Sequence, residues 1–212
     1  MPTAPYKNKK GERLPSVTTI LGRFKESGGL LYWAWNCGRD GISMNEVKEQ
    51  ACSAGTIAHQ WIEDTIHGKQ LSPAGPVSID IVEKARNAYD QFLAWRVGFN
   101  VEVTHTELSL VSEEHQFGGT LDGVSFNGKP AVLDWKTSNA IFPDYLYQCA
   151  AYAILLEENY GVKIDEAHIL RVSKENADFE HRRFAGLDDA KEVFKLFAKA
   201  YHLVKRVDKR VK

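Results

Sequence analysis

The chain has 212 residues, of which 43% are hydrophobic and 11% aromatic, a composition that excludes a disordered protein and suffices for one large folded domain. No run of about 18 apolar residues exists, and the start MPTAPYKNKKGER lacks the apolar stretch of a signal peptide, so we expect a cytoplasmic protein without a membrane partner. The net charge of −1 gives no overall signature of nucleic-acid binding.

The two ends of the chain are locally basic, at Lys7–Arg13 and at Lys205–Lys212. Such segments either contact nucleic acid or are solvated tails, and we favour the solvated tail. No internal repeat or long linker divides the chain. We therefore expect a single domain over residues 1–212, with a flexible basic N-terminus at 1–13 and a basic tail at 206–212.

Three cysteines are present, Cys37, Cys52 and Cys149. Their odd number and the lack of CxxC spacing argue against a disulfide framework, a zinc site and a four-cysteine iron–sulfur cluster. We expect reduced thiols.

Two short stretches open the ordered part of the chain. LPSVTTIL, at Leu14–Leu21, has a turn or helix-cap signal in its Pro-Ser pair before an apolar run. Leu30–Asp40 contains Tyr32, Trp33 and Trp35, which suit either a packed helix or a surface on which nucleic-acid bases stack. We expect at least two of these three aromatic side chains to pack in the core.

A helix is predicted over Asn45–His67, where apolar residues recur at spacings of three and four. His59 and Glu63 are neighbours on one side of it. A single histidine on a helix fits a structural role beside Glu63 as well as a role as a ligand. Gly55-Thr56, one turn earlier, is a small-residue patch that lets another backbone or a ligand approach closely.

The next segments predict a loop at Gly68–Ser78, a second amphipathic helix over Ile79–Val97 and a strand over Val101–Val111. Glu107 lies on one face of this strand. It either reaches a site formed by acidic residues that follow or is an ordinary solvated residue.

The central stretch FGGTLDGVSFNGKPAVLDWKTS predicts a β-hairpin. Its two strand-like runs, Gly119–Phe126 and Pro130–Lys136, are joined by an Asn-Gly pair at 127–128 that readily takes the positive φ of a tight turn. The hairpin places Asp122 and Asp134 on neighbouring strands.

The two-residue period of a strand puts Asp134 and Lys136 on one face and Leu133 and Trp135 on the other. Asp122 is then within reach across the hairpin. Two carboxylates on rigid strands can bind a hard divalent cation, which activates water and neutralises charge on a phosphate, while the lysine polarises the water or stabilises the transition state. The alternative is a hairpin face that carries ordinary solvated charges.

After the hairpin, a helix is predicted from Pro143 to about Glu158, with Gln148 and Tyr152 four residues apart on one side. The order of helices and strands predicts an α/β (α+β) fold with a central mixed sheet flanked by helices. The remaining predicted elements are strands over Ile164–Ser173 and Asp178–Phe184 and an amphipathic helix over Asp188–Lys205.

Several motifs occur in the order known from one nuclease superfamily. Asp122 followed by Asp134–Lys136 resembles the PD-(D/E)xK signature. Gly55–His59 (GTIAH) resembles the GTxxH helix of the RecB-like branch, and Gln148–Tyr152 (QCAAY) matches its QxxxY motif. Together with LPSVTTIL, these motifs make the chain similar to exonucleases of phages and of mitochondrial genome maintenance.

The resemblance implies a restriction-endonuclease-like core and a Mg²⁺ or Mn²⁺ ion. It implies that Lys136 is catalytic together with Asp122 and Asp134. The implied metal ligands are His59, Asp122, Asp134 and the backbone carbonyl of Trp135; Gln148, Tyr152, Thr137 and Ser138 would face the substrate, with Glu107 and Glu63 as accessory acids.

The activity implied by the resemblance is that of a metal-dependent deoxyribonuclease. We expect an exonuclease that hydrolyses linear, single-stranded or end-processed DNA in phage or bacterial replication or recombination. A structure-specific or nicking endonuclease and a catalytically silent nucleic-acid-binding module are the alternatives. The chain has Leu121-Asp122 where Pro-Asp is usual, and it lacks a GxxxxGK[ST] loop, so unwinding would need a partner. Candidate partners besides DNA are a helicase, a recombinase and a single-strand-binding protein.

Overall fold

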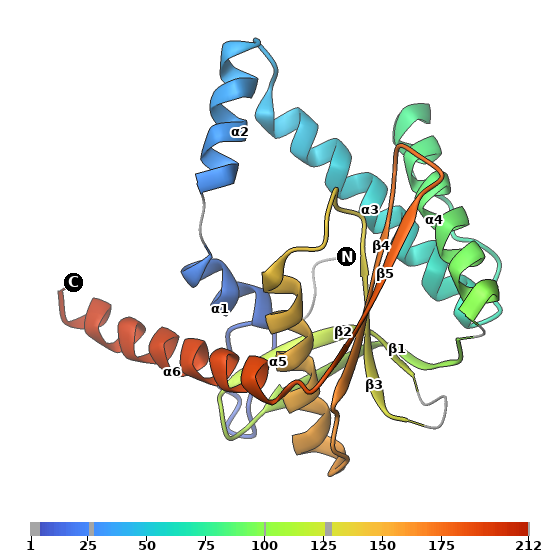
Figure 1. Ribbon diagram of the computed structural model, residues 1–212. Coiled ribbons are helices and arrows are strands. Elements are labelled where there is room, and N and C mark those ends of the chain that lie inside the picture. Colours follow the sequence, from blue (N-terminus) through green and yellow to red (C-terminus); the bar gives the residue numbers. More distant parts are fainter. Residues whose placement is uncertain (1–4, 26–27, 100, 126–128, 212) are drawn as a thin grey trace.

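The computed structural model describes residues 5–25, 28–99, 101–125 and 129–211. A five-stranded mixed sheet lies between two groups of helices, as Figure 1 shows. The predicted α/β class is confirmed, and the arrangement is consistent with a restriction-endonuclease-like core. None of the helices in this part of the chain is long and apolar enough to cross a membrane. The three cysteines are free thiols, as predicted.

Helices and strands follow one another as the sequence predicts, with ends that differ by up to two residues except at the end of α6, which lies six residues beyond the predicted one. In chain order they are α1 (Val17–Phe24), α2 (Gly28–Arg39), α3 (Met44–Ile66), α4 (Ile79–Phe99), β1 (Val103–Ser112), β2 (Phe117–Ser125), β3 (Ala131–Lys136), α5 (Pro143–Tyr160), β4 (Glu166–Val172), β5 (Phe179–Ala185) and α6 (Asp188–Val211).

Local sequence explains where several helices begin and end. The side chain of Ser16 accepts a hydrogen bond from the backbone N–H of Thr19 and so caps α1, as the Pro-Ser pair predicts. Ser43 caps α3 in the same way through Glu46. Gly161 ends α5 in the left-handed conformation, with φ of 67°, which glycine adopts without steric cost.

The sheet has the strand order β1-β2-β3-β4-β5. Neighbouring strands pair antiparallel except for β3 and β4, which pair parallel. A parallel pair needs a crossover connection, and α5 supplies it. The predicted hairpin of β2 and β3 is confirmed by their antiparallel pairing, whereas its predicted turn at 127–128 lies outside the described residues.

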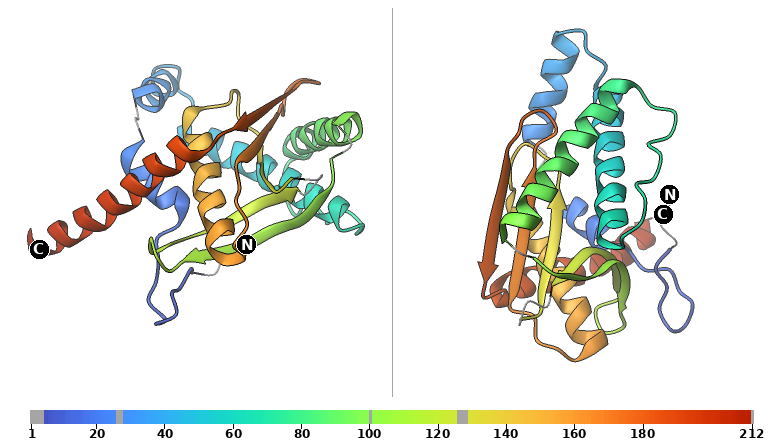
Figure 2. Two further views of the ribbon diagram at one scale, coloured as in Figure 1. Left: turned by 60° about the horizontal axis from the view of Figure 1, so that its bottom comes forward. Right: turned by 90° about the vertical axis from the view of Figure 1, so that its right-hand side faces the viewer.

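Helices α1, α5 and α6 cover one face of the sheet, and α3 and α4 cover the other (Figures 1 and 2). On the α5 side, Phe117 and Phe194 are fully buried. On the α4 side, Phe92, Trp95 and Trp135 pack together. Each such side chain contributes roughly 1.5–3 kcal/mol by burial, so β3 is fixed between two apolar layers.

The N-terminal segment packs against β2. A Cβ atom on Gly118 would lie 2.3 Å from Cγ of Tyr6, so the ring of Tyr6 can lie there only because residue 118 is glycine. The hydroxyl groups of Tyr6 and Thr120 are hydrogen-bonded at 2.8 Å, and Asn8 is buried. The described part of the N-terminus, residues 5–13, thus packs against the sheet, whereas its flexibility stays a prediction.

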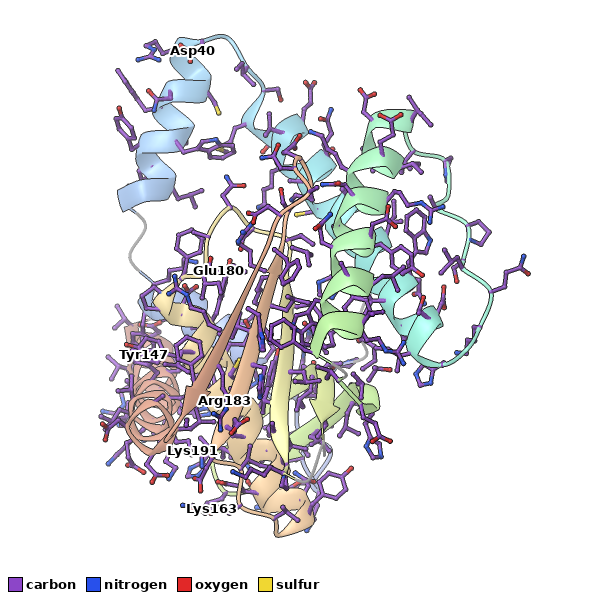
Figure 3. The ribbon with its side chains drawn as sticks, turned by 45° about the vertical axis from the view of Figure 1, so that its right-hand side comes forward. Asp40, Tyr147, Lys163, Glu180, Arg183 and Lys191 are labelled. Atoms are coloured by element: carbon purple, nitrogen blue, oxygen red, sulfur yellow. The ribbon has the colours of Figure 1, made fainter. Side chains whose placement is uncertain are left out.

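Helix α6 continues to Val211, so the expected basic tail is helical in its described part, 206–211. The start of α6 is tied to α5 by Lys191, labelled in Figure 3, whose Nζ lies 2.7 Å from Oε1 of Glu157. The C-terminal half of α6 extends away from the sheet (Figure 2, left).

Helix α2 stands apart from the other helices except at its connection to α3 (Figure 1). Tyr32 is 66% and Trp35 is 60% exposed, and Trp33 is half-buried, so the prediction that two of the three pack in the core is wrong. Within α2, whose residues are all described, only Cys37 is buried. The sequence places aromatic residues on the helix but does not reveal that, among the described elements, none covers Tyr32 and Trp35.

Candidate active site

The candidate site lies where β2 and β3 separate. Their ladder ends at the pair Gly123–Leu133. Just beyond it, the backbone N–H of Trp135 donates a hydrogen bond of 2.9 Å to Oδ2 of Asp122. The carboxylate of Asp122 thus accepts a hydrogen bond from the backbone of the neighbouring strand. This bond holds Asp122 next to Asp134, as the predicted hairpin implies.

Asp134 and Lys136 form a buried ion pair. Nζ of Lys136 lies 2.8 Å from Oδ1 and 2.7 Å from Oδ2 of Asp134. Asp134 is 0% exposed and the Lys136 side chain 15%, so these two residues are not solvated surface charges. Leu133 and Trp135 pack into the cluster on the opposite face, as the two-residue period of a strand predicts.

The charges of the site do not balance. Burial raises the pKa of Asp134, and the charge of Asp122 adds to this rise, while Lys136 opposes it. Burial would lower the pKa of Lys136, but the carboxylates of Asp134 and Asp122 raise it well above its usual value. Lys136 therefore stays protonated near neutral pH. One ammonium group faces two carboxylates, which favours the binding of a further cation.

Helix α3 brings His59 to the same place. Its Nδ1 lies 3.7 Å from Oδ1 of Asp122, and in the described part of the chain no ion pair joins it to Glu63. The close approach of α3 depends on Gly55, because a Cβ atom there would lie 2.8 Å from Oγ1 of Thr137. The small-residue patch thus fits α3 against the end of β3.

Glu107 on β1 has the left-handed φ of 50°, which is strained for a residue other than glycine. A register shift between Val103 and His105 precedes it, so the regular alternation predicted for this strand is interrupted. The side chain remains exposed, yet partial burial of its carboxyl group and the charges of Asp122 and Glu63 raise the pKa of Glu107 to about 7. Glu107 thus lies close enough to Asp122 and to Glu63 for their charges to act on it.

The predicted substrate-facing residues differ in their surroundings. Gln148 donates a hydrogen bond of 2.7 Å to the hydroxyl of Tyr152. Tyr152 is buried. Its ring packs so closely against Gly119 that a Cβ atom on residue 119 would lie 2.8 Å from Cε1 of the ring. Tyr152 therefore orients Gln148 and is not open to a substrate strand. Ser138 donates to the carbonyl of Ala140 and shapes the loop after β3.

Two further residues lie near the ion pair. Nζ of Lys136 lies 5.0 Å from the centroid of the Tyr145 ring. Cys149 is buried beside the pair, and burial together with the charge of Asp134 raises the pKa of its thiol well above the usual value, so it is not a nucleophile. The sequence pattern alone does not single out either residue, although their helical spacing from Gln148 and Tyr152 places them on one side of α5.

The donor atoms fit a hard divalent cation only in part. Oδ2 of the buried Asp134 accepts no hydrogen bond within the described structure, although it lies 2.7 Å from the Lys136 ammonium, so it keeps a lone pair for a ligand. Across those same residues, no group of three or more His, Cys, Asp and Glu side chains converges on one point. Mg²⁺ commonly uses one or two carboxylates and completes its shell with water and substrate phosphate. Asp122 and Asp134 match that pattern.

No family model and no curated protein sequence matches the chain. Among solved structures, it is similar to a provisionally named exonuclease of Eubacterium rectale, with 14% identity and a TM-score of 0.47. The match covers 76% of this chain and 66% of that one, just under two thirds of its length. It is also similar to an alkaline exonuclease of Laribacter hongkongensis, with 12% identity, a TM-score of 0.37 and coverage of 74% and 86%. At such low similarity these structures do not assign a function to the chain.

Proposed function

We propose that the chain is a divalent-metal-dependent nuclease that hydrolyses phosphodiester bonds of DNA. The observation that carries this proposal is the meeting of Asp122, Asp134 and Lys136 where β2 and β3 separate, with Asp134 fully buried. Placing two carboxylates beside a single lysine away from water costs stability, because one negative charge has no partner. Such an excess negative charge is expected where it serves a function. Catalysis on a charged substrate is such a function.

The chain's own residues would act in distinct ways. Asp122 and Asp134 would hold the cation, with His59 and the Trp135 carbonyl as further candidate ligands. Bound Mg²⁺ or Mn²⁺ supplies a Lewis acid that lowers the pKa of water and neutralises phosphate charge. Lys136 keeps its proton, so it donates a hydrogen bond to the attacking water or to a phosphate oxygen and does not serve as the base. The expected products carry a 5′ phosphate.

Two features support a single DNA strand as substrate. The rings of Tyr32 and Trp35 stack on α2 with centroids 6.2 Å apart, and the Arg39 guanidinium lies 5.2 Å from the Trp35 centroid. Exposed aromatic rings beside a cation are suited to stacking with unpaired bases, and each stacked base contributes about 1–3 kcal/mol. We expect Trp35→Ala to weaken binding of single-stranded DNA about tenfold. Val97→Ala, which alters an exposed side chain on α4, is the matched control.

One assay compares the exonuclease with its alternatives. Purified protein is mixed with Mg²⁺ or Mn²⁺ and either end-labelled linear single-stranded DNA or a covalently closed circle of the same sequence. We expect progressive loss of the linear strand and survival of the circle. Cutting of the circle at a comparable rate would identify an endonuclease. Binding of DNA without cutting of either substrate would identify a catalytically silent binding module. Partners such as a helicase, a recombinase or a single-strand-binding protein stay predictions.

A further inference from the structure

The two basic ends of the chain meet in one groove. It has a volume of about 1300 Å³ and is lined by the N-terminal segment, the start of α1, the β1–β2 turn and α6. Arg13 comes from the first basic stretch, and Lys205, Arg206 and Lys209 come from the last. Residues that are about 190 positions apart in the sequence thus share one surface. None of the lining residues belongs to the candidate active site.

The α6 wall of the groove carries a regular stripe of basic side chains. The spacings alternate between four and three residues, which keeps the side chains on one side of a helix. The stripe is about 21 Å long at 1.5 Å per residue. It consists of Lys195, Lys199, His202, Arg206 and Lys209.

The groove carries an excess of positive charge although the whole chain has a net charge of −1. Six Lys and Arg side chains line it against three Glu side chains, an excess of three positive charges. Glu192 is already paired with Lys195 at 2.8 Å. In the described part of the chain, Lys199, Arg206 and Lys209 form no ion pair. These exposed cations are therefore available to an anionic partner.

We propose that this groove binds the phosphodiester backbone of DNA beyond the segment held at the active site. This inference rests on the proposed function and extends it to a second contact surface. Ser16, Thr18 and Thr19 at the start of α1 also line the groove, and phosphate contacts come typically from Lys, Arg, Ser and Thr. A long concave groove fits an extended strand, whereas a membrane surface is flat.

The test measures binding and needs no cleavage. DNA of about 30 nucleotides and of about 8 nucleotides, with a chelator present, is titrated with protein at several salt concentrations. The groove variant is Lys199→Gln, Arg206→Gln and Lys209→Gln. The control variant is Lys69→Gln, Lys84→Gln and Lys163→Gln, which lie outside the groove. Both variants change the net charge from −1 to −4, because each loses three positive charges.

For the long DNA, we expect the groove variant to reduce the slope of log K against log salt by about 2, since each lost phosphate contact on a single strand accounts for about 0.7. The control variant should show little change. Equal slopes for the two variants with long DNA would overturn the inference. Loss of binding to polyglutamate or to anionic vesicles with unchanged DNA binding would also overturn it and assign the groove to another partner. Cleavage of the short DNA with Mn²⁺ tests the proposed nuclease separately.

Discussion

The buried pair of Lys136 and Asp134 allows a quantitative prediction. Replacing Lys136 by Met keeps the apolar stem beside Tyr145 and removes the ammonium group that lies 2.7 and 2.8 Å from the Asp134 oxygens. Because Asp134 is fully buried, its carboxylate is left without a cation at bonding distance. Breaking a buried ion pair in this way costs about 3–5 kcal/mol.

Protonation of Asp134 limits this cost. An unfolded aspartate titrates near pH 3.9, so holding the folded carboxyl neutral at pH 7 costs about 4 kcal/mol, and at pH 5 only about 1.5 kcal/mol. The sign follows from the raised pKa of Asp134: the variant should gain stability as the pH falls toward the unfolded value. Lys136→Met should therefore be about 3–4 kcal/mol less stable than the wild type at pH 7, and both proteins should gain stability toward pH 5, because the pKa of Asp134 is raised in the wild type as well.

Urea unfolding without metal measures the loss of unfolding free energy. The variants Asp134→Asn and Lys136→Met/Asp134→Asn complete a double-mutant cycle with Lys136→Met. The double variant leaves no unpaired charge, so it should be more stable than Lys136→Met, with a coupling energy of about 2 kcal/mol or more. Nuclease activity with Mn²⁺ should fall roughly 10²-fold or more in all three variants. If Lys136→Met unfolds within about 0.5 kcal/mol of the wild type at both pH values, the buried pair is not formed as described.

Three other predictions concern separate parts of the structure. His59→Ala should weaken Mn²⁺ binding in calorimetry, and the wild type should be more active with Mn²⁺ than with Mg²⁺, because imidazole suits the softer ion; unchanged metal affinity would remove His59 from the site. Gly119→Ala should cost about 1–3 kcal/mol in unfolding experiments, since its Cβ atom would lie 2.8 Å from the Tyr152 ring, and a neutral effect would contradict that packing. The hydrogen bond from Arg183 lowers the pKa of Glu166 to about 2, so Glu166→Gln should cost about 1 kcal/mol at pH 7, given the exposure of Arg183, and almost nothing near pH 2. A loss that is independent of pH would rule out this ion pair.

The parts of the site that the sequence predicts are those governed by local rules. The alternation of side chains along one short strand places Asp134 beside Lys136 and opposite Trp135, and this depends on a period that tertiary packing does not change. Gly55 likewise predicts a close approach, although the sequence does not say that Thr137 is the neighbour.

The parts that were not predicted depend on long-range packing. The N-terminal segment is held because Gly118 leaves room for Tyr6, a contact between residues more than a hundred positions apart. Helix α2, which carries the exposed rings of Tyr32 and Trp35, has the composition of a core helix, and only the fold determines that none of the described elements covers these rings. The strained backbone at Glu107 has no signal in a strand-like sequence pattern.

Cleavage by the Asp134→Asn variant tests the central claim most directly. Wild type and variant are incubated with end-labelled linear single-stranded DNA and Mn²⁺, with chelator controls, after unfolding curves confirm that both are folded. An amide is a poorer ligand than a carboxylate for a hard cation, so the variant should lose roughly 10²-fold or more of the rate while the wild type releases products that carry a 5′ phosphate. Equal cleavage by the two proteins, or wild-type cleavage that persists in chelator, would contradict the account.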